Sequence, residues 1–224
     1  MLVVWIAAFM AASGAPSPLE MARDKQDRAA LTELVMQYNA AAAKAPSDAE
    51  AQYRAALANS YLAEVQIELK DRKAGGLAAE QGIKLAEKAV SLKPDNAEYY
   101  RLLGTVYGQA VTNIMSGLSY GAKAKDAINK AVERAPKSSM VYVARGVGNY
   151  YLPAQLGGGP KLAIPDFQKA IELDGHNAEA WLWLGLSLRK DNRDEEARKA
   201  FAKSLELNPN RLWAKQQLEK TPAK

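Results

Sequence analysis

One short phrase recurs along this chain of 224 residues. Its copies read AEKAVSLKP at 86–94, INKAVERAP at 128–136, FQKAIELDG at 167–175 and FAKSLELNP at 201–209, with a weaker copy, YNAAAAKAP, at 38–46. Each strong copy carries a small residue in its middle and a helix-ending proline or glycine five positions later. Self-similarity of this kind indicates an array of repeats, in which each unit buries its apolar face only by stacking on its neighbours.

The spacing of the helix-ending residues shows that the repeats are unequal in length. These residues are Pro46, Pro94, Pro136, Gly175 and Pro209, and the successive intervals are 48, 42, 39 and 34 residues. The apolar positions of the last and shortest interval predict a helix, a turn at 191–193 and a second helix. The extra residues of the earlier repeats are therefore predicted to lie between the two helices of each pair and to lengthen the first helix.

The final unit resembles the tetratricopeptide repeat, a 34-residue pair of helices with the pattern W-x₂-L-G-x₂-Y, then A-x₃-F, then P. Its matching positions are Trp181, Leu184, Gly185, Leu188, Ala197, Phe201, Ser204 and Pro209, of which Leu188 and Ser204 depart from the pattern. The three earlier units match less closely. The resemblance implies an all-α fold, a right-handed α-solenoid of antiparallel helix pairs, with lengthened first helices in the early repeats.

The same pattern divides the chain into segments. We expect a signal peptide at 1–15, an N-terminal capping helix at 16–47, repeats at 48–95, 96–137, 138–176 and 177–210, and a C-terminal capping helix and tail at 211–224. Gly104, Gly146 and Gly185 are predicted to let the first helix of a pair approach the second closely, because they lack a side chain. Pro165 predicts a second helix that begins late or bends, because proline removes a helical hydrogen bond.

The N-terminal stretch has the composition of an export signal. Residues 2–12 read LVVWIAAFMAA, and small residues at 13–15 precede Pro16, as in a signal-peptide cleavage region. The run is shorter than the about 20 apolar residues that span a bilayer, and no Lys or Arg precedes it. We expect an exported, periplasmic protein, which the lack of cysteine also fits. An uncleaved anchor and a buried N-terminal helix are the alternatives.

Composition argues against catalysis and against nucleic-acid binding. The 30 basic and 25 acidic residues are interspersed, which is typical of solvated helix faces. The chain has no cysteine, and its one histidine, His176, falls in a turn between repeats. Nucleophilic and metal chemistry therefore have few suitable residues. The glycine-rich loop at 157–160 lacks the Lys-Ser/Thr ending of a phosphate-binding loop and predicts a connecting turn. We expect no enzyme, no cofactor and no metal site.

The resemblance further implies that the first helices line a concave groove that binds an extended or helical peptide. The groove positions at which we expect contact with a partner are Asn59, Arg101, Gln109, Val143, Tyr150, Leu182 and Arg189. Arg101 and Arg189 are expected to be exposed and to face acidic groups of the partner. For Tyr150 and Leu182 the alternative is that the C-terminal helix covers them.

Two functions from different classes remain open at this point. The first is a non-catalytic protein-interaction scaffold of the cell envelope, which holds a protein or peptide segment in the groove. The second is a periplasmic carrier of a small molecule or lipid that serves a transporter. Peripheral association with a membrane and the oligomeric state are also open.

Overall fold

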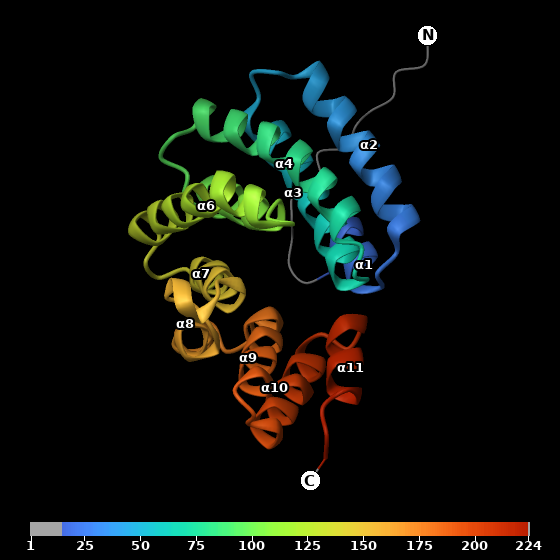
Figure 1. Cartoon of the computed structure of the whole chain (residues 1–224). Coiled ribbons are helices and arrows are strands. Elements are labelled where there is room, and N and C mark those ends of the chain that lie inside the picture. The colour runs from blue at the N-terminus through green and yellow to red at the C-terminus, as the bar shows by residue number, and fades with distance from the viewer. Residues whose placement is uncertain (1–14, 224) are drawn as a thin grey trace.

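The computed structural model describes residues 15–223, and all regular structure in this range is helical (Figure 1). Residues 1–14, on which the predicted signal peptide falls, lie outside the described residues. Within 15–223, none of the helices combines the length and the apolar character needed to cross a membrane. The elements are α1 (Pro18–Asp24), α2 (Arg28–Lys44), α3 (Ala49–Glu68), α4 (Arg72–Leu92), α5 (Ala97–Gln109), α6 (Ile114–Arg134), α7 (Ser139–Tyr151), the 3₁₀ turn η1 (Ala154–Leu156), α8 (Pro160–Leu173), α9 (Ala178–Lys190), α10 (Asp194–Leu207) and α11 (Leu212–Glu219).

Local sequence signals set the helix ends. α3, α5 and α9 begin after Asp48, Asn96 and Asn177, whose side-chain oxygens accept hydrogen bonds from backbone N–H groups of the first turn. α4 and α6 end at Leu92 and Arg134, two residues before the prolines of the recurring phrase, because the residue before proline disfavours helical backbone. The predicted all-α solenoid of helix pairs is confirmed, with the pairs α3/α4, α5/α6, α7/α8 and α9/α10.

Close packing within three of these pairs depends on the predicted glycines. A Cβ atom would lie 2.6 Å from Ile128 Cδ1 if added at Gly104, 2.6 Å from Phe167 Cε1 at Gly146 and 2.6 Å from Phe201 Cε1 at Gly185. Real Cβ atoms do not approach side chains this closely, so the contacts require glycine. Phe167 and Phe201 are fully buried in the core that these contacts close.

The prediction of lengthened first helices is right for α3 alone. α3 has 20 residues, whereas α5 and α7 have 13, as does α9. In the second pair the extra residues lengthen the second helix instead, since α6 has 21 residues. In the third pair they form a connection that contains η1, with left-handed backbone at Gly157 and Gly159. A connection between the two helices therefore takes up the extra residues in the third pair alone, whereas in the first two pairs they lengthen one or both of the helices beside the turn.

Two further expectations need correction. The expected single N-terminal capping helix consists of two helices, because the chain turns between α1 and α2 with left-handed backbone at Gln26. α8 does not begin late, since it begins at Pro160 and contains Pro165. Proline at the first helical position is favourable because the N–H that it lacks has no partner there.

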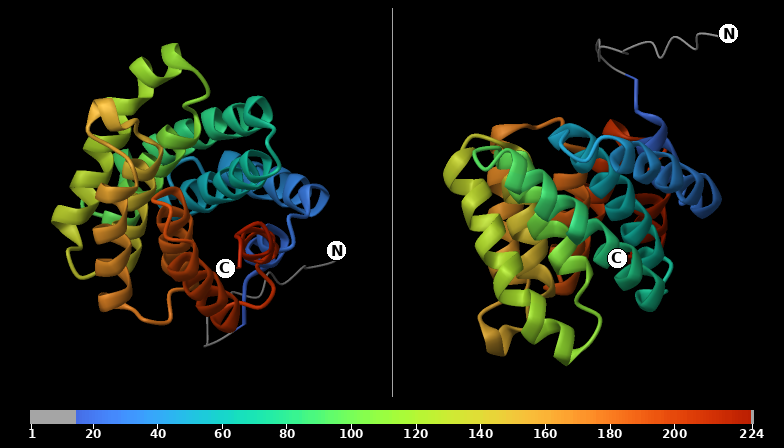
Figure 2. Two further views of the ribbon diagram at one scale, coloured as in Figure 1. Left: turned by 60° about the horizontal axis from the view of Figure 1, so that its bottom comes forward. Right: turned by 90° about the horizontal axis from the view of Figure 1, so that it is seen from above.

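The array curls until its two ends meet. In Figure 1, α1 and α11 lie on the same side of the molecule, and Figure 2 shows them side by side from a second direction. Asn208 Nδ2 donates a 2.8 Å hydrogen bond to Asp24 Oδ2, and Gln216 Nε2 donates a 3.0 Å hydrogen bond to Gln26 Oε1. The helices therefore enclose a ring whose inner face is formed in part by α1, α3, α9 and α11.

Candidate functional site

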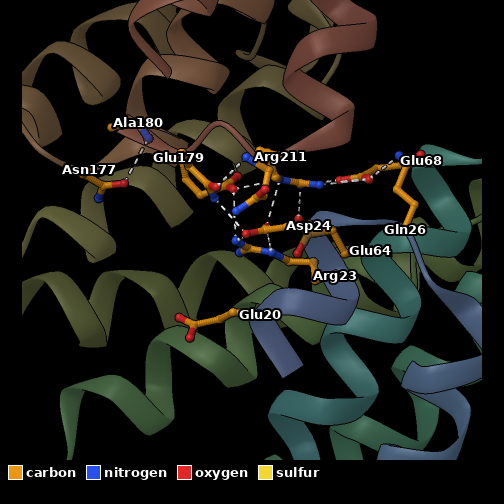
Figure 3. Close-up of polar contacts among 12 residues, drawn as sticks. Glu20, Arg23, Asp24, Gln26, Glu64, Glu68, Asn177, Glu179, Ala180 and Arg211 are labelled. Carbon is orange, nitrogen blue, oxygen red and sulfur yellow. Dashed lines mark hydrogen bonds and ion pairs between the residues drawn. The ribbon is translucent and has the colours of Figure 1, made fainter. Parts of the chain in front are cut away.

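Arg211, at the start of α11, lies at the centre of the contact between the two ends (Figure 3). Its side chain has no exposed surface. Nε donates a 2.9 Å hydrogen bond to Glu179 Oε1 on α9, and Nη2 donates a 2.6 Å hydrogen bond to Glu64 Oε1 on α3. Both terminal nitrogens also donate to the Glu68 carboxylate. One guanidinium group thus joins the first full repeat to the last.

A second arginine extends this group of charges. Arg23, on α1, donates a 2.7 Å hydrogen bond to Asp24 and lies 3.4 Å from Glu179 Oε1. Asp24 Oδ1 also lies 3.8 Å from Arg211 Nε. We call the six residues the closure cluster, and its members are Arg23, Asp24, Glu64, Glu68, Glu179 and Arg211. Two guanidinium groups face four carboxylates, so negative charge is in excess.

Burial and charge shift the pKa values within the closure cluster in opposite directions. Burial is the main cause that raises the pKa of Glu64 to about 8, because Arg211 and Arg23 offset it only in part and Glu68 and Glu179 oppose ionisation. For Glu179 burial also acts to raise the pKa, but Arg211 and Arg23 outweigh it and lower the pKa. Of these two carboxyl groups, Glu64 therefore takes up a proton more readily.

Aromatic side chains continue the inner face beside the closure cluster. The Arg211 guanidinium lies 5.4 Å from the ring centre of Trp213, and Trp213 packs edge-to-face on Trp183 at 5.3 Å. Tyr151 packs on Trp183 at 5.9 Å. The end of α7 therefore packs against α9.

Some of this inner face is accessible to a ligand. Tyr151 is 48% exposed, and the Glu64 side chain is 22% exposed although Arg211 contacts it. Tyr61, which contacts the Arg23 guanidinium at 4.9 Å, is also only partly buried. Together these three residues present two phenol rings and one carboxyl group, which suit a ligand with a cationic and an apolar part.

Four of the predicted groove residues are buried in the fold. Val143 and Leu182 belong to the core cluster of the last two repeats. Asn59 donates hydrogen bonds to Asn39 Oδ1 at 2.9 Å and to Ala55 O at 2.8 Å. Arg101 is 9% exposed, against the expectation of an exposed charge, because it forms a two-point ion pair with Glu98.

The remaining three predicted groove residues are partly exposed but have partners within the chain. Gln109 donates to Ser60 O at 3.2 Å and accepts from Ser60 Oγ at 3.0 Å. Arg189 donates to Gln217 Oε1 at 2.6 Å, so that it holds α11 instead of facing solvent freely. Tyr150 packs edge-to-face on Trp183 at 5.6 Å. The structure therefore does not bring the predicted residues together in one continuous open groove.

Sequence reasoning missed the closure cluster. Arg211 follows the last helix-ending proline, where a polar and solvated residue is the ordinary expectation at the end of a repeat array. Its carboxylate partners lie 32 to 147 positions away in the sequence. The sequence signal nearest to it is the spacing of Glu64 and Glu68, which places two carboxylates on one helix face.

The described residues offer little for catalysis or metal binding. Among residues 15–223 no group of three or more His, Asp or Glu side chains is arranged to hold a metal ion. His176 is exposed in the turn before α9, as expected, and its backbone N–H bonds to Asp174 Oδ1 at 3.0 Å. Gly157–Gly159 form part of the connecting turn around η1.

The signature of the tetratricopeptide repeat family matches residues 157–211, which hold α8, α9 and α10. Over these residues the chain resembles tetratricopeptide repeat (TPR) proteins. A thermophilic TPR protein of Thermus thermophilus is 20% identical, with a TM-score of 0.62 over 89% of this chain and 97% of that one. The HusA haemophore of Porphyromonas gingivalis is 21% identical, with a TM-score of 0.58 over 80% of this chain and 96% of that one. No curated protein matches the chain.

At these identities the two solved structures show a shared fold alone. They support the arrangement of helix pairs along nearly the whole chain, beyond the part that the family signature matches. The residues of the closure cluster and of the inner face therefore have to be interpreted from their own contacts.

Proposed function

We propose that this protein is a non-catalytic interaction scaffold of the cell envelope, and that it holds a basic segment of a partner protein against the inner face of the ring. The observation that carries the proposal is the excess of carboxylates in the closure cluster, of which Glu64 is partly exposed, together with the exposed Tyr151. A Lys or Arg side chain of the partner would find there both a carboxylate and aromatic faces.

The charge of the proposed partner is opposite to the one predicted from the sequence. Arg101 and Arg189 were expected to attract an acidic segment, but Glu98 and Gln217 occupy their guanidinium groups. Arg211 and Arg23 are likewise paired with carboxylates of the chain. The accessible ionisable group on this part of the inner face is the Glu64 carboxyl, which a bound cation would ionise, so a basic segment is the better match.

The coupling between Glu64 and a bound cation gives the proposal a pH signature. With no partner bound, the pKa of Glu64 is about 8, so the group is largely protonated at neutral pH. A cation placed beside the carboxylate favours its ionised form and lowers this pKa. Binding is therefore expected to release a proton near pH 7 and to strengthen as the pH rises from 6 to 8.

Site-directed photo-crosslinking tests where the partner lies. A photoreactive phenylalanine replaces Tyr151 on the inner face or Met36 on α2, which is exposed on another face and serves as the matched control. We expect the probe at position 151 to crosslink to one segment of the partner that is rich in Lys or Arg, and the probe at position 36 to give no such crosslink. Polylysine should compete with this crosslinking. Glu64→Gln should weaken this capture and remove its pH dependence. Capture from position 36 alone, or an acidic captured segment, would exclude the proposal.

The carrier function stays as the alternative from the sequence. It receives no further weight from the likeness to a haemophore, because that likeness is one of fold. Native mass spectrometry of the purified protein separates the two functions: a bound organic molecule of constant mass supports the carrier, and a bound polypeptide supports the scaffold.

A further inference from the structure

One edge of the ring carries an unusual concentration of exposed apolar side chains. We call this edge the turn rim and define it as the three connections between first and second helices, residues 69–77, 110–125 and 152–162. Seven of the twelve exposed large apolar residues in the described chain fall in these segments, and five fall elsewhere. Those on the turn rim are Leu69, Leu77, Ile114, Met115, Leu118, Leu156 and Leu162.

The three connections project on the same side of the molecule. In both views of Figure 2 the beginning of α6 and the segment around η1 extend beyond the body of the ring in one direction. The turn between α3 and α4 joins this edge, because a Cβ added at Gly76 on α4 would lie 2.6 Å from Thr112 Cγ2 in the next connection. Arg72, Lys73, Leu77 and Glu80 border a groove together with Thr112 and Asn113.

The beginning of α6 is the most prominent part of the turn rim. α6 is eight residues longer than α5, with 21 residues against 13, so its first turns extend past the partner helix. There Ile114, Met115 and Leu118 are 83%, 72% and 76% exposed. Residues 107–122 contain no charged side chain. Such a helix end can enter an apolar phase without burying a charge.

The charges around these apolar side chains are mostly positive. The turn rim contains six basic residues, Lys70, Arg72, Lys73, Lys123, Lys125 and Lys161, and one acidic residue, Asp71. All seven are exposed. The rim therefore carries a formal charge of +5, the same as the whole chain. Apolar side chains at the tips of projecting turns with a basic surround are the pattern of a surface that lies in the interface of an anionic membrane.

We propose that the turn rim docks on an anionic lipid surface, with Ile114, Met115 and Leu118 inserted among the acyl chains and the basic residues against the phosphate groups. Charge complementarity favours lipid over a second copy of this chain, because two turn rims would bring together two surfaces of +5. The inference does not depend on the proposed function, since lipid docking rests on the beginning of α6 and the basic residues, none of which belongs to the closure cluster.

The lack of cysteine allows an insertion test at single positions of the full chain. Met115→Cys and, as control, Met36→Cys each receive an environment-sensitive fluorophore; both positions are exposed, at 72% and 60%. Vesicles contain phosphatidylcholine alone or with one third phosphatidylglycerol. We expect a blue shift from position 115 with the anionic vesicles, loss of the shift at high salt, and no shift from position 36. This comparison is independent of any contribution by residues 1–14, which both variants share.

A charge test completes the experiment. Lys73→Glu with Lys161→Glu reverses two rim charges, and Lys84→Glu with Lys88→Glu makes the same change on the outer part of α4. We expect the rim variant to bind anionic vesicles at least about 25-fold more weakly, from roughly fivefold for each basic residue, and the control to lose far less. No shift at position 115, or equal losses in the two charge variants, would overturn the proposal. The proposal would also be overturned if the protein formed dimers in the absence of vesicles and the double variant Ile114→Ser with Leu118→Ser abolished them. That result would identify a second copy of the chain as the occupant of the turn rim.

Discussion

Replacing Arg211 by alanine tests whether the meeting of the two chain ends stabilises the fold. The change removes four hydrogen bonds to three carboxylates and leaves Glu64, Glu68 and Glu179 with Arg23 as the remaining cation of the cluster. Removing one partner of a buried ion pair costs about 3–5 kcal/mol, because the other charge stays buried without compensation. For a chain of this size that loss lowers the melting temperature by roughly 6–20 °C.

The location of the loss distinguishes a closed ring from an open solenoid. In an open repeat array each unit contacts only its neighbours, so a change in α11 would affect α9 and α10 alone. In the closed ring Arg211→Ala should also reduce the hydrogen-exchange protection of α1 and of the end of α3, which lie more than 140 residues away in the sequence. Arg211→Lys keeps the positive charge but loses the forked arrangement of N–H donors, so its loss of stability should lie between zero and that of Arg211→Ala.

Arg193→Ala is the matched control for Arg211→Ala. Arg193 also pairs with a glutamate, Glu196, but it lies on the surface with 39% of its side chain exposed. A surface ion pair of this kind contributes at most about 1 kcal/mol. Thermal melts in which the two variants lose equal stability, or exchange data in which α1 keeps its protection in Arg211→Ala, would refute the role of Arg211 in ring closure.

Three further predictions concern pH and packing. The pKa of Glu64 is higher in the folded chain, about 8, than its unfolded value of about 4.3, so its protonation stabilises the fold fully below about pH 4 and this contribution is lost as the pH rises through 8; Glu64→Gln should flatten the pH dependence of denaturant melts over that window, and an unchanged slope would contradict the assignment. Gly146→Ala should destabilise by about 1–3 kcal/mol because its Cβ meets Phe167, whereas Gly148→Ala on the same helix has open space around it and should stabilise by up to about 1 kcal/mol; urea melts that rank them in the opposite order would show the packing to be wrong. His176→Ala should change the free energy of unfolding by less than about 0.5 kcal/mol, since the side chain is exposed in a turn, and a larger change in the same melts would show an unrecognised contact.

The repeats could be predicted because their determinants are local. The helix-ending prolines, the N-terminal caps and the glycines at close contacts act over short stretches of the chain. Gly185 and Phe201 illustrate this, because they belong to the same repeat and define the approach of α9 to α10. Such pairs recur from one repeat to the next, so the sequence pattern alone is enough to reveal them.

The distribution of the inserted residues could not be predicted in the same way. The sequence shows only how many residues each early repeat has beyond 34, and not where in the repeat they lie. The structure assigns these residues to both helices of α3/α4, to the second helix of α5/α6 and to a turn in α7/α8. In the pair α5/α6, Asn113 determines that the extra residues lengthen α6. Its side chain and that of Ser116 form a reciprocal N-terminal cap, so α6 begins early. This cap is a two-residue signal that the apolar pattern does not contain.

The closure cluster depends on the combined geometry of all the repeats, so no single sequence motif predicts it. Each helix pair adds a small rotation, and only the accumulated rotation brings the two ends of the array together (Figure 2) and places Arg211 beside Glu64 and Glu68 (Figure 3). The predicted groove residues are engaged for a more local reason. Their positions follow the family pattern, in which the first helices line an open surface, but Arg101 pairs with Glu98 on its own helix and Arg189 bonds to the adjacent α11. The proposed partner would instead contact inner side chains that the fold leaves partly exposed, such as Glu64.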